Sequence, residues 1–241
     1  MAKHRKKVYG PCAYCNVDHG PDWPLTLDHV IPECLFPRGK APADTPIVYA
    51  CRTCNNTKKN QDDTFLQQLL VMDDEASGHP IAQEIFEGPV TRAIKAKGRV
   101  QSPLAQMVWR NQGRKISFIS PGGIYLGEGF SPDIPPERIE RIFSTIVRGL
   151  SLFYTGKDIP EGTTYDVIRA RDNKKPIANA AQWLLANGGA HRKAGDGQVF
   201  ECLYGVAQDR PEASIWILEF YRRIHVVVVT GVPDPPTETS A

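Results

Sequence analysis

Four of the six cysteines form two Cys-x-x-Cys pairs, which is a spacing typical of metal ligands. They are Cys12, Cys15, Cys51 and Cys54. Two intervening residues let the backbone curl so that both sulfurs of a pair reach one ion, and tetrahedral Zn²⁺ takes four ligands. A four-thiolate site leaves no open coordination position, so the pattern predicts a structural zinc ion. The other two, Cys34 and Cys202, are expected to be unpaired, small apolar residues.

The stretch between the two pairs contains "LTLDHVIP", with Asp28 next to His29. It is longer than a usual zinc-ribbon loop, so the zinc is expected to hold a second site in place. Neutral histidine suits the removal of a proton from water near neutral pH. Carboxylate and amide oxygens are ligands for Mg²⁺, which can stabilise charge on a phosphate. These residue types therefore suit metal-assisted hydrolysis.

The order of "CAYC", "LDHVIP" and "ACRTCNNTK" resembles the HNH endonuclease family, over residues 12 to about 60, a quarter of the chain. The resemblance implies a ββα-metal fold, in which two strands and a helix hold one divalent cation. It also implies that His29 is the general base and that Asp28 and Asn55 bind a catalytic Mg²⁺ or Mn²⁺. The four paired cysteines would then hold a separate structural Zn²⁺.

Two features of this motif leave its geometry open. Neighbouring side chains of a regular strand point to opposite faces, so Asp28 and His29 can serve one phosphate only if the strand ends or bends there. The family's middle polar residue corresponds to Pro46. Either a neighbouring side chain or a backbone carbonyl orients the histidine instead, or the site is weakened.

Basic residues near the motif are expected to contact nucleic-acid phosphates, namely Arg52, Lys58 and Lys59. Residues 1–60 hold nine Lys or Arg against five Asp or Glu, and the whole chain has a formal net charge of +2. Four thiolates around one Zn²⁺ would cancel about half of the local excess, so charge alone is a weak sign of DNA binding. The run "KHRKK" near the start is the more specific signal.

The elements that must position this site follow from periodicity and from turn residues. A helix is expected from Asn55 or Asn56, an amphipathic helix after it, and an interrupted helical stretch within 81–97. The strongest helix lies between Pro136 and Gly156. Strands are expected at 25–30, 47–50, 198–207, 214–220 and 224–231, with a Pro-Gly-Gly hairpin within 115–127.

These elements predict the α+β class: a small ββα-metal zinc module, then helices, then a separate α+β domain with antiparallel strands. The expected divisions are a nuclease module (1–61), a helical connector (62–102), an α+β domain for target recognition or dimerisation (103–231) and a disordered tail (232–241).

The leading hypothesis is a metal-dependent DNA endonuclease, in restriction or phage defence. The alternative is a zinc-stapled nucleic-acid-binding protein without catalysis. The expected partner is DNA, and a homodimer is possible. No apolar run approaches the ~20 residues that cross a bilayer, and no apolar segment follows the basic N-terminus, so a cytoplasmic protein is expected.

Overall fold

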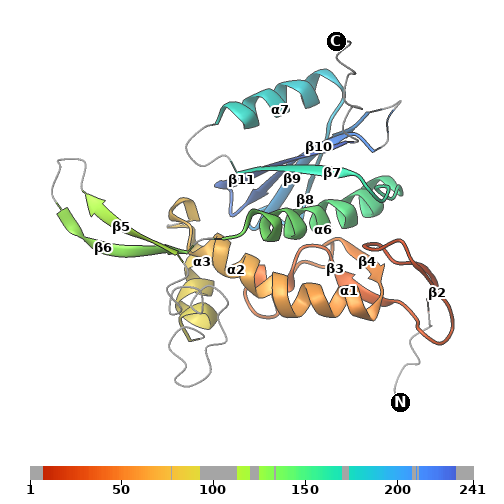
Figure 1. The fold of residues 1–241 in the computed structure, drawn as a ribbon, viewed down its shortest axis with the longest axis horizontal. Helices are drawn as coiled ribbons and strands as arrows, with labels where there is room; N and C mark the ends of the chain where they lie inside the picture. Colours follow the sequence, from red (N-terminus) through yellow and green to blue (C-terminus); the bar gives the residue numbers. More distant parts are fainter. Residues whose placement is uncertain are drawn as a thin grey trace, which may run out of the picture.

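The computed structural model describes residues 8–76, 78–92, 113–119, 125–132, 134–169, 174–207, 210 and 212–231. It contains helices and antiparallel sheets, which confirms the α+β class. Figure 1 shows the N-terminal strands on one side of a long helix, α6 (Pro136–Thr155), and the C-terminal sheet on its other side. The basic run at 3–7 and the predicted disordered tail lie outside the described residues.

The N-terminal module is built from two short antiparallel strand pairs. β1 (Gly10–Pro11) pairs with β2 (Asp18–His19), and the first cysteine turn lies between them. β3 (Thr26–His29) pairs with β4 (Ile47–Ala50), and α1 (Arg52–Thr57) follows at once. Both strands predicted here, around 25–30 and 47–50, are confirmed. The order of β3, β4 and α1 is the expected two strands and a helix.

Helix α1 begins at Arg52, before the predicted start, because Cys51 caps it. The Cys51 sulfur accepts a hydrogen bond from the backbone N–H of Cys54 at 3.4 Å. The helix continues through a π-helical segment, η2 (Lys58–Asp63), into α2 (Thr64–Val71). The wider π turn places polar side chains of η2 inside the protein, a distortion that is frequent at functional sites.

Three short segments surround this helical run. They are η1 (Glu33–Leu35), η3 (Asp74–Ala76) and α3 (Pro80–Ile85). The predicted interruption near Pro89 is confirmed, because α3 passes into π-helical turns, η4 (Phe86–Val90), that contain this proline. The rest of the predicted helical stretch, 93–97, lies outside the described residues.

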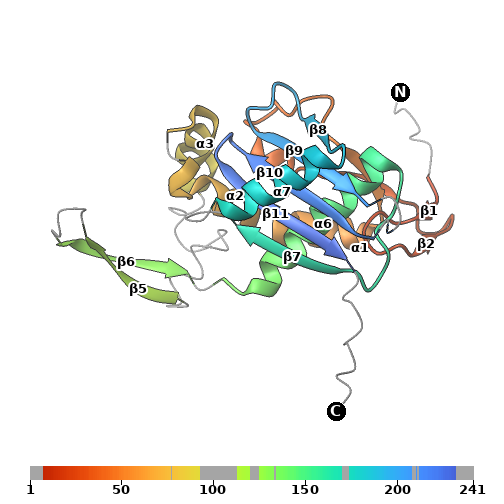
Figure 2. The same cartoon turned by 90° about the horizontal axis from the view of Figure 1, so that it is seen from above.

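The predicted hairpin is confirmed as the antiparallel pair β5 (Gly113–Ile119) and β6 (Tyr125–Pro132). Its Pro-Gly-Gly turn lies outside the described residues. Figure 2 shows the two strands extending away from the other elements.

Helix α6 confirms the strongest sequence prediction, including both of its ends. Pro136 occupies the first turn, and Gly156 ends the helix in the left-handed conformation at φ 70°, where its N–H bonds to the Leu152 carbonyl. None of the helices in the described part of the chain combines the length and apolar character needed to span a bilayer.

The C-terminal sheet has five antiparallel strands in the order β7-β11-β10-β9-β8. Its strands are β7 (Thr164–Arg169), β8 (Ala190–Lys193), β9 (Phe200–Val206), β10 (Ser214–Phe220) and β11 (Ile224–Gly231). The three central strands are those predicted. The edge strands and α7 (Lys175–Ala186) were not predicted; in Figure 1, α6 and α7 lie on opposite faces of this sheet.

One hydrophobic core joins the N-terminal module, α6 and the sheet, with members as far apart as Val30, Ile146 and Trp216. Helix α6 comes close to the N-terminal module at Gly149, where an added Cβ would lie 2.8 Å from both methyl carbons of Val30. Glycine is therefore required for α6 to pack this closely on the chain just after β3. The core thus fixes the position of the candidate site relative to the rest of the protein.

Candidate metal centre and catalytic site

The paired cysteines meet at one point, where their four sulfur atoms all lie within 4.8 Å of one another. In the described part of the chain, this is the only group of three or more Cys, His, Asp or Glu side chains close enough to share an ion. The donor set is the one that tetrahedral zinc prefers. The structure therefore brings together all four predicted ligands in a cluster that could hold Zn²⁺.

The surroundings shift the pKa values of the clustered cysteines in different directions. Burial raises the pKa of Cys12, but backbone N–H groups of Cys51 and Tyr14 outweigh it, and the net pKa is lowered. Burial and the neighbouring thiols raise the pKa of Cys54. Four thiolates cannot all remain charged so close together without a positive ion, and a zinc ion would supply that charge.

The remaining cysteines are free, as predicted. Burial raises the pKa of the Cys34 thiol to about 12, and it raises the pKa of Cys202 to about 12 as well. Such thiols are protonated and unreactive at neutral pH.

Asp28 lies on the inner face of β3, with only 6% of its surface exposed. The Tyr14 hydroxyl, from the first cysteine turn, donates to Asp28 Oδ2 at 2.5 Å. The ammonium of Lys58 lies 3.3 Å from the same oxygen. Both contacts use Oδ2, so Oδ1 has no hydrogen-bond partner among the described residues and remains available to a cation.

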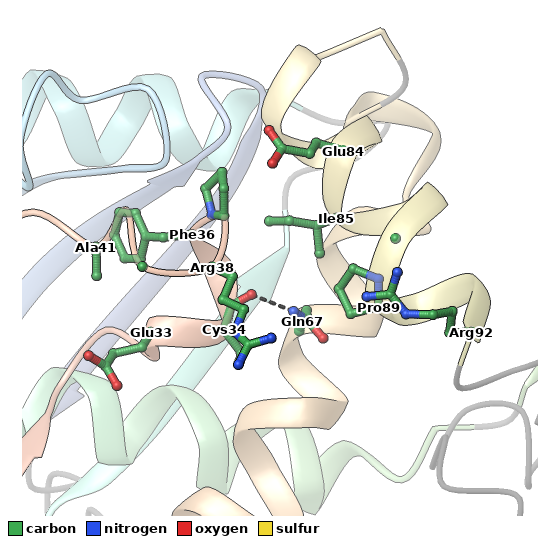
Figure 3. A pocket seen from close by; sticks show the side chains of 13 residues that line it. Glu33, Cys34, Phe36, Arg38, Ala41, Gln67, Glu84, Ile85, Pro89 and Arg92 are labelled. Atoms are coloured by element: carbon green, nitrogen blue, oxygen red, sulfur yellow. Dashed lines mark hydrogen bonds between the residues drawn. The ribbon is translucent and has the colours of Figure 1, made fainter.

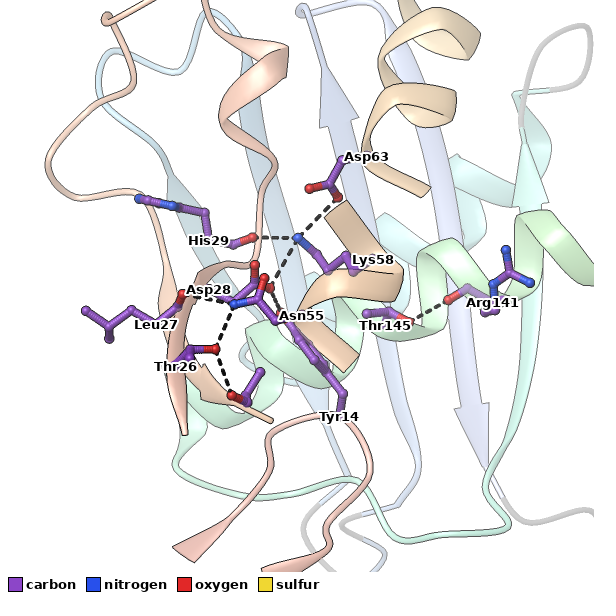
Figure 4. Close-up of polar contacts among 11 residues, drawn as sticks. Tyr14, Thr26, Leu27, Asp28, His29, Asn55, Lys58, Asp63, Arg141 and Thr145 are labelled. Atoms are coloured by element: carbon purple, nitrogen blue, oxygen red, sulfur yellow. Dashed lines mark hydrogen bonds and ion pairs between the residues drawn. The ribbon is translucent and has the colours of Figure 1, made fainter. Parts of the chain in front are cut away.

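Lys58 is buried, with 4% exposure, which argues against its expected contact with nucleic acid. Its ammonium donates to the His29 carbonyl at 2.7 Å and lies 3.2 Å from Asp63 Oδ1. Figure 4 shows Lys58 between Asp28, the His29 carbonyl and Asp63. We therefore correct its role from a surface cation to an internal counter-ion that connects the end of β3 to η2.

The side-chain amide of Asn55 has a defined orientation. Its Nδ2 donates to Thr26 Oγ1 at 3.0 Å and to the Leu27 carbonyl at 3.1 Å. Thr26 already donates its own hydroxyl proton to the Ala50 carbonyl, so both partners of Asn55 require a donor. The amide oxygen then has no hydrogen bond to a described residue.

His29 lies on the opposite face of β3 from Asp28. Its side chain is 34% exposed, and its Nε2 lies 3.6 Å from Glu33 Oε1. In Figure 4 the His29 ring points away from Lys58, whereas its carbonyl points toward it. Asp28 and His29 therefore point to opposite faces of the strand, as the alternation of a regular strand predicts.

A cavity of about 540 Å³ at the end of β3 is nevertheless lined by both residues. Asn55 and Lys59 also line it. Asp63 is a further carboxylate on its wall, and burial raises the pKa of this residue although Lys58 opposes the shift. Arg52 is exposed on α1, and it and Lys59 remain expected nucleic-acid contacts.

Pro46 cannot supply a side-chain hydrogen bond to the histidine, but its carbonyl has a structural role. It accepts the backbone N–H of Val30 at 2.9 Å and extends the pairing beyond β3. A different side chain lies beside the His29 ring, because Glu33 Oε1 is 3.6 Å from His29 Nε2.

Sequence reasoning missed Tyr14, Glu33 and Asp63. Only Glu33 had a detectable signal, since it lies four residues after His29. The chain matches no protein-family model, no curated protein and no solved structure. The geometry of this site and the resemblance of its motif are therefore the two indications of function.

Proposed function

We propose that the chain is a metal-dependent endonuclease of the HNH type that hydrolyses phosphodiester bonds in DNA. The observation that carries this proposal is that His29, Asp28 and Asn55 border one cavity. Asp28 and His29 come from β3 and Asn55 comes from α1, whose first turn the cysteine cluster connects to the first cysteine turn. This combination of a base, oxygen ligands and a rigid support suits metal-assisted hydrolysis.

His29 is the proposed general base, because it is accessible to a water molecule and has a carboxylate, Glu33, within 3.6 Å of Nε2 to orient or polarise the ring. Its backbone is held in place by the Lys58 ammonium. This contact restrains the backbone of His29 and leaves its ring free to rotate about the side-chain bonds.

Asp28 and Asn55 are the proposed ligands of a divalent cation, which would stabilise negative charge on the scissile phosphate. The donor set fits such an ion: each side chain has one oxygen that is free of hydrogen bonds to described residues. Asp63, on the same cavity wall, adds a second carboxylate.

The decisive experiment measures cleavage of plasmid DNA by the purified chain over a range of Mg²⁺ and Mn²⁺ concentrations. His29→Ala is expected to retain zinc and folding but to lower the cleavage rate by roughly 10² to 10⁴, the usual contribution of a general base. His191→Ala, at an exposed histidine of β8, is the matched control and should cleave at the wild-type rate.

Asp28→Ala and Asn55→Ala should instead shift the metal dependence of cleavage to higher concentration. Excess metal should partly rescue Asn55→Ala, because a neutral amide oxygen is the weaker ligand, and it should not rescue His29→Ala. Wild-type cleavage by His29→Ala would disprove the assignment of the base.

The alternative, a zinc-stapled DNA-binding protein without catalysis, is favoured by one orientation and one contact. Asp28 and His29 point to opposite faces of β3, and the Lys58 ammonium lies close to the Asp28 carboxylate. DNA binding by the wild-type chain without cleavage at any Mg²⁺ or Mn²⁺ concentration would select this alternative.

A further inference from the structure

A second cavity, of about 840 Å³, adjoins the candidate catalytic cavity. Glu33 and Cys34, in η1, line both cavities, so they form the partition between the two. The second cavity lies among η1, the loop that follows it, α2 and the α3–η4 segment, as Figure 3 shows. A polymer bound at the first cavity could therefore continue into the second without leaving the protein surface.

Two arginines bring positive charge to the wall of this second cavity, which also contains Glu33 and Glu84. Arg38 comes from the loop after η1, and Arg92 follows η4; both are exposed. Neither guanidinium forms a hydrogen bond or ion pair with another described residue. Each acidic group in the wall has a partner nearby: Glu84 Oε1 lies 3.8 Å from the Lys40 ammonium, and Glu33 Oε1 lies 3.6 Å from His29 Nε2.

The rest of the wall offers apolar surface and one ordered amide. Phe36, Ile85 and Pro89 line it, and Gln67 donates its side-chain N–H to the Cys34 carbonyl. A nucleotide has the matching parts, because its phosphate suits a guanidinium and its sugar and base suit an apolar wall.

We propose that this second cavity binds a nucleotide adjacent to the scissile phosphate, with Arg38 and Arg92 contacting the DNA backbone. The inference rests on the proposed nuclease function and extends it to the path of the substrate strand. Charge complementarity and the wall shared with the catalytic cavity both support it.

The test uses the full chain carrying His29→Ala, which is expected to prevent cleavage, and a fluorescent DNA oligonucleotide. Kd is measured between about 50 and 200 mM salt for Arg38→Ala, Arg92→Ala and the double variant in that background. Each phosphate contact contributes about 0.9 to the salt slope, so each single variant should bind about 15-fold more weakly at 50 mM salt. The double variant should lose on the order of 200-fold in DNA affinity, and the magnitude of its salt slope should fall by about two.

Lys157→Ala, at an exposed lysine after α6, is the control for a general loss of positive charge and should change the slope little. Zinc content and melting curves must match the parent in every variant. An unchanged slope in the double variant, with salt-dependent binding by the parent, would overturn this inference alone. If the parent itself does not bind DNA, the proposed nuclease function fails as well.

Discussion

Replacing Lys58 by methionine would keep the aliphatic stem and remove the ammonium between two carboxylates. Lys58 is 5% exposed in its side chain, and the side chains of Asp28 and Asp63 are 8% and 16% exposed. Removal of one partner from a buried ion pair costs about 3 to 5 kcal/mol, because it leaves the other charge buried and uncompensated. For a chain of this size, that loss corresponds to a melting temperature lower by about 6 to 20 °C.

The assay is urea unfolding at neutral pH with zinc content measured in parallel, since intact zinc shows that the cysteine cluster survives. Adding Asp63→Asn to Lys58→Met should recover part of the loss, because one buried negative charge is then removed. Asp63→Asn alone should cost less than Lys58→Met, since Lys58 keeps Asp28 as a partner. A loss below about 1 kcal/mol for Lys58→Met would refute the role of internal counter-ion.

Three further perturbations test other parts of the structure. Cys51→Ser should abolish stoichiometric zinc and unfold the N-terminal module, since structural zinc contributes on the order of 10 kcal/mol to small folds; metal analysis and circular dichroism would show it, and a zinc-free but cooperatively folded module would contradict it. Gly149→Ala should cost about 1 to 3 kcal/mol by forcing its methyl group into Val30, and Val30→Ala should restore part of that in the double variant, as measured by urea midpoints. The third perturbation concerns a pair in which the Glu219 hydrogen bond raises the pKa of His225 and the same bond lowers the pKa of Glu219. The pair stabilises the fold fully between the ordinary pKa of glutamate, about 4.5, and that of histidine, about 6.5. This stabilisation is lost as the pH rises through the raised pKa of His225 or falls through the lowered pKa of Glu219. Glu219→Gln should therefore reduce the free energy of unfolding more at about pH 5.5 than at about pH 8.5, and an equal loss at both would show that the pair does not titrate in this way.

Local sequence patterns were sufficient for much of this protein. The two cysteine pairs predicted a cluster that the fold brings together, because a Cys-x-x-Cys turn depends only on its own few residues. Helix α6 was predicted with its ends, since its apolar stripe, Pro136 and Gly156 are all local signals. The central strands of the sheet were equally clear from their apolar runs.

Elements with weak local signals were found only in the structure. β8 has four residues, and β7 exposes polar side chains at the sheet edge, so neither has the continuous apolar run of a central strand. Helix α7 covers the sheet through a small apolar cluster around Leu184, which becomes recognisable only once the sheet has formed beneath it.

The polar groups around His29 depended on tertiary structure for a physical reason. Lys58 is an ordinary basic residue in the sequence, and it becomes an internal counter-ion because η2 packs against a strand 29 residues earlier. Tyr14 and Asp63 approach this site from separate segments in the same way. A charge can be buried only where partners from distant segments meet it, so no local pattern could predict which lysine faces solvent and which one holds the site together.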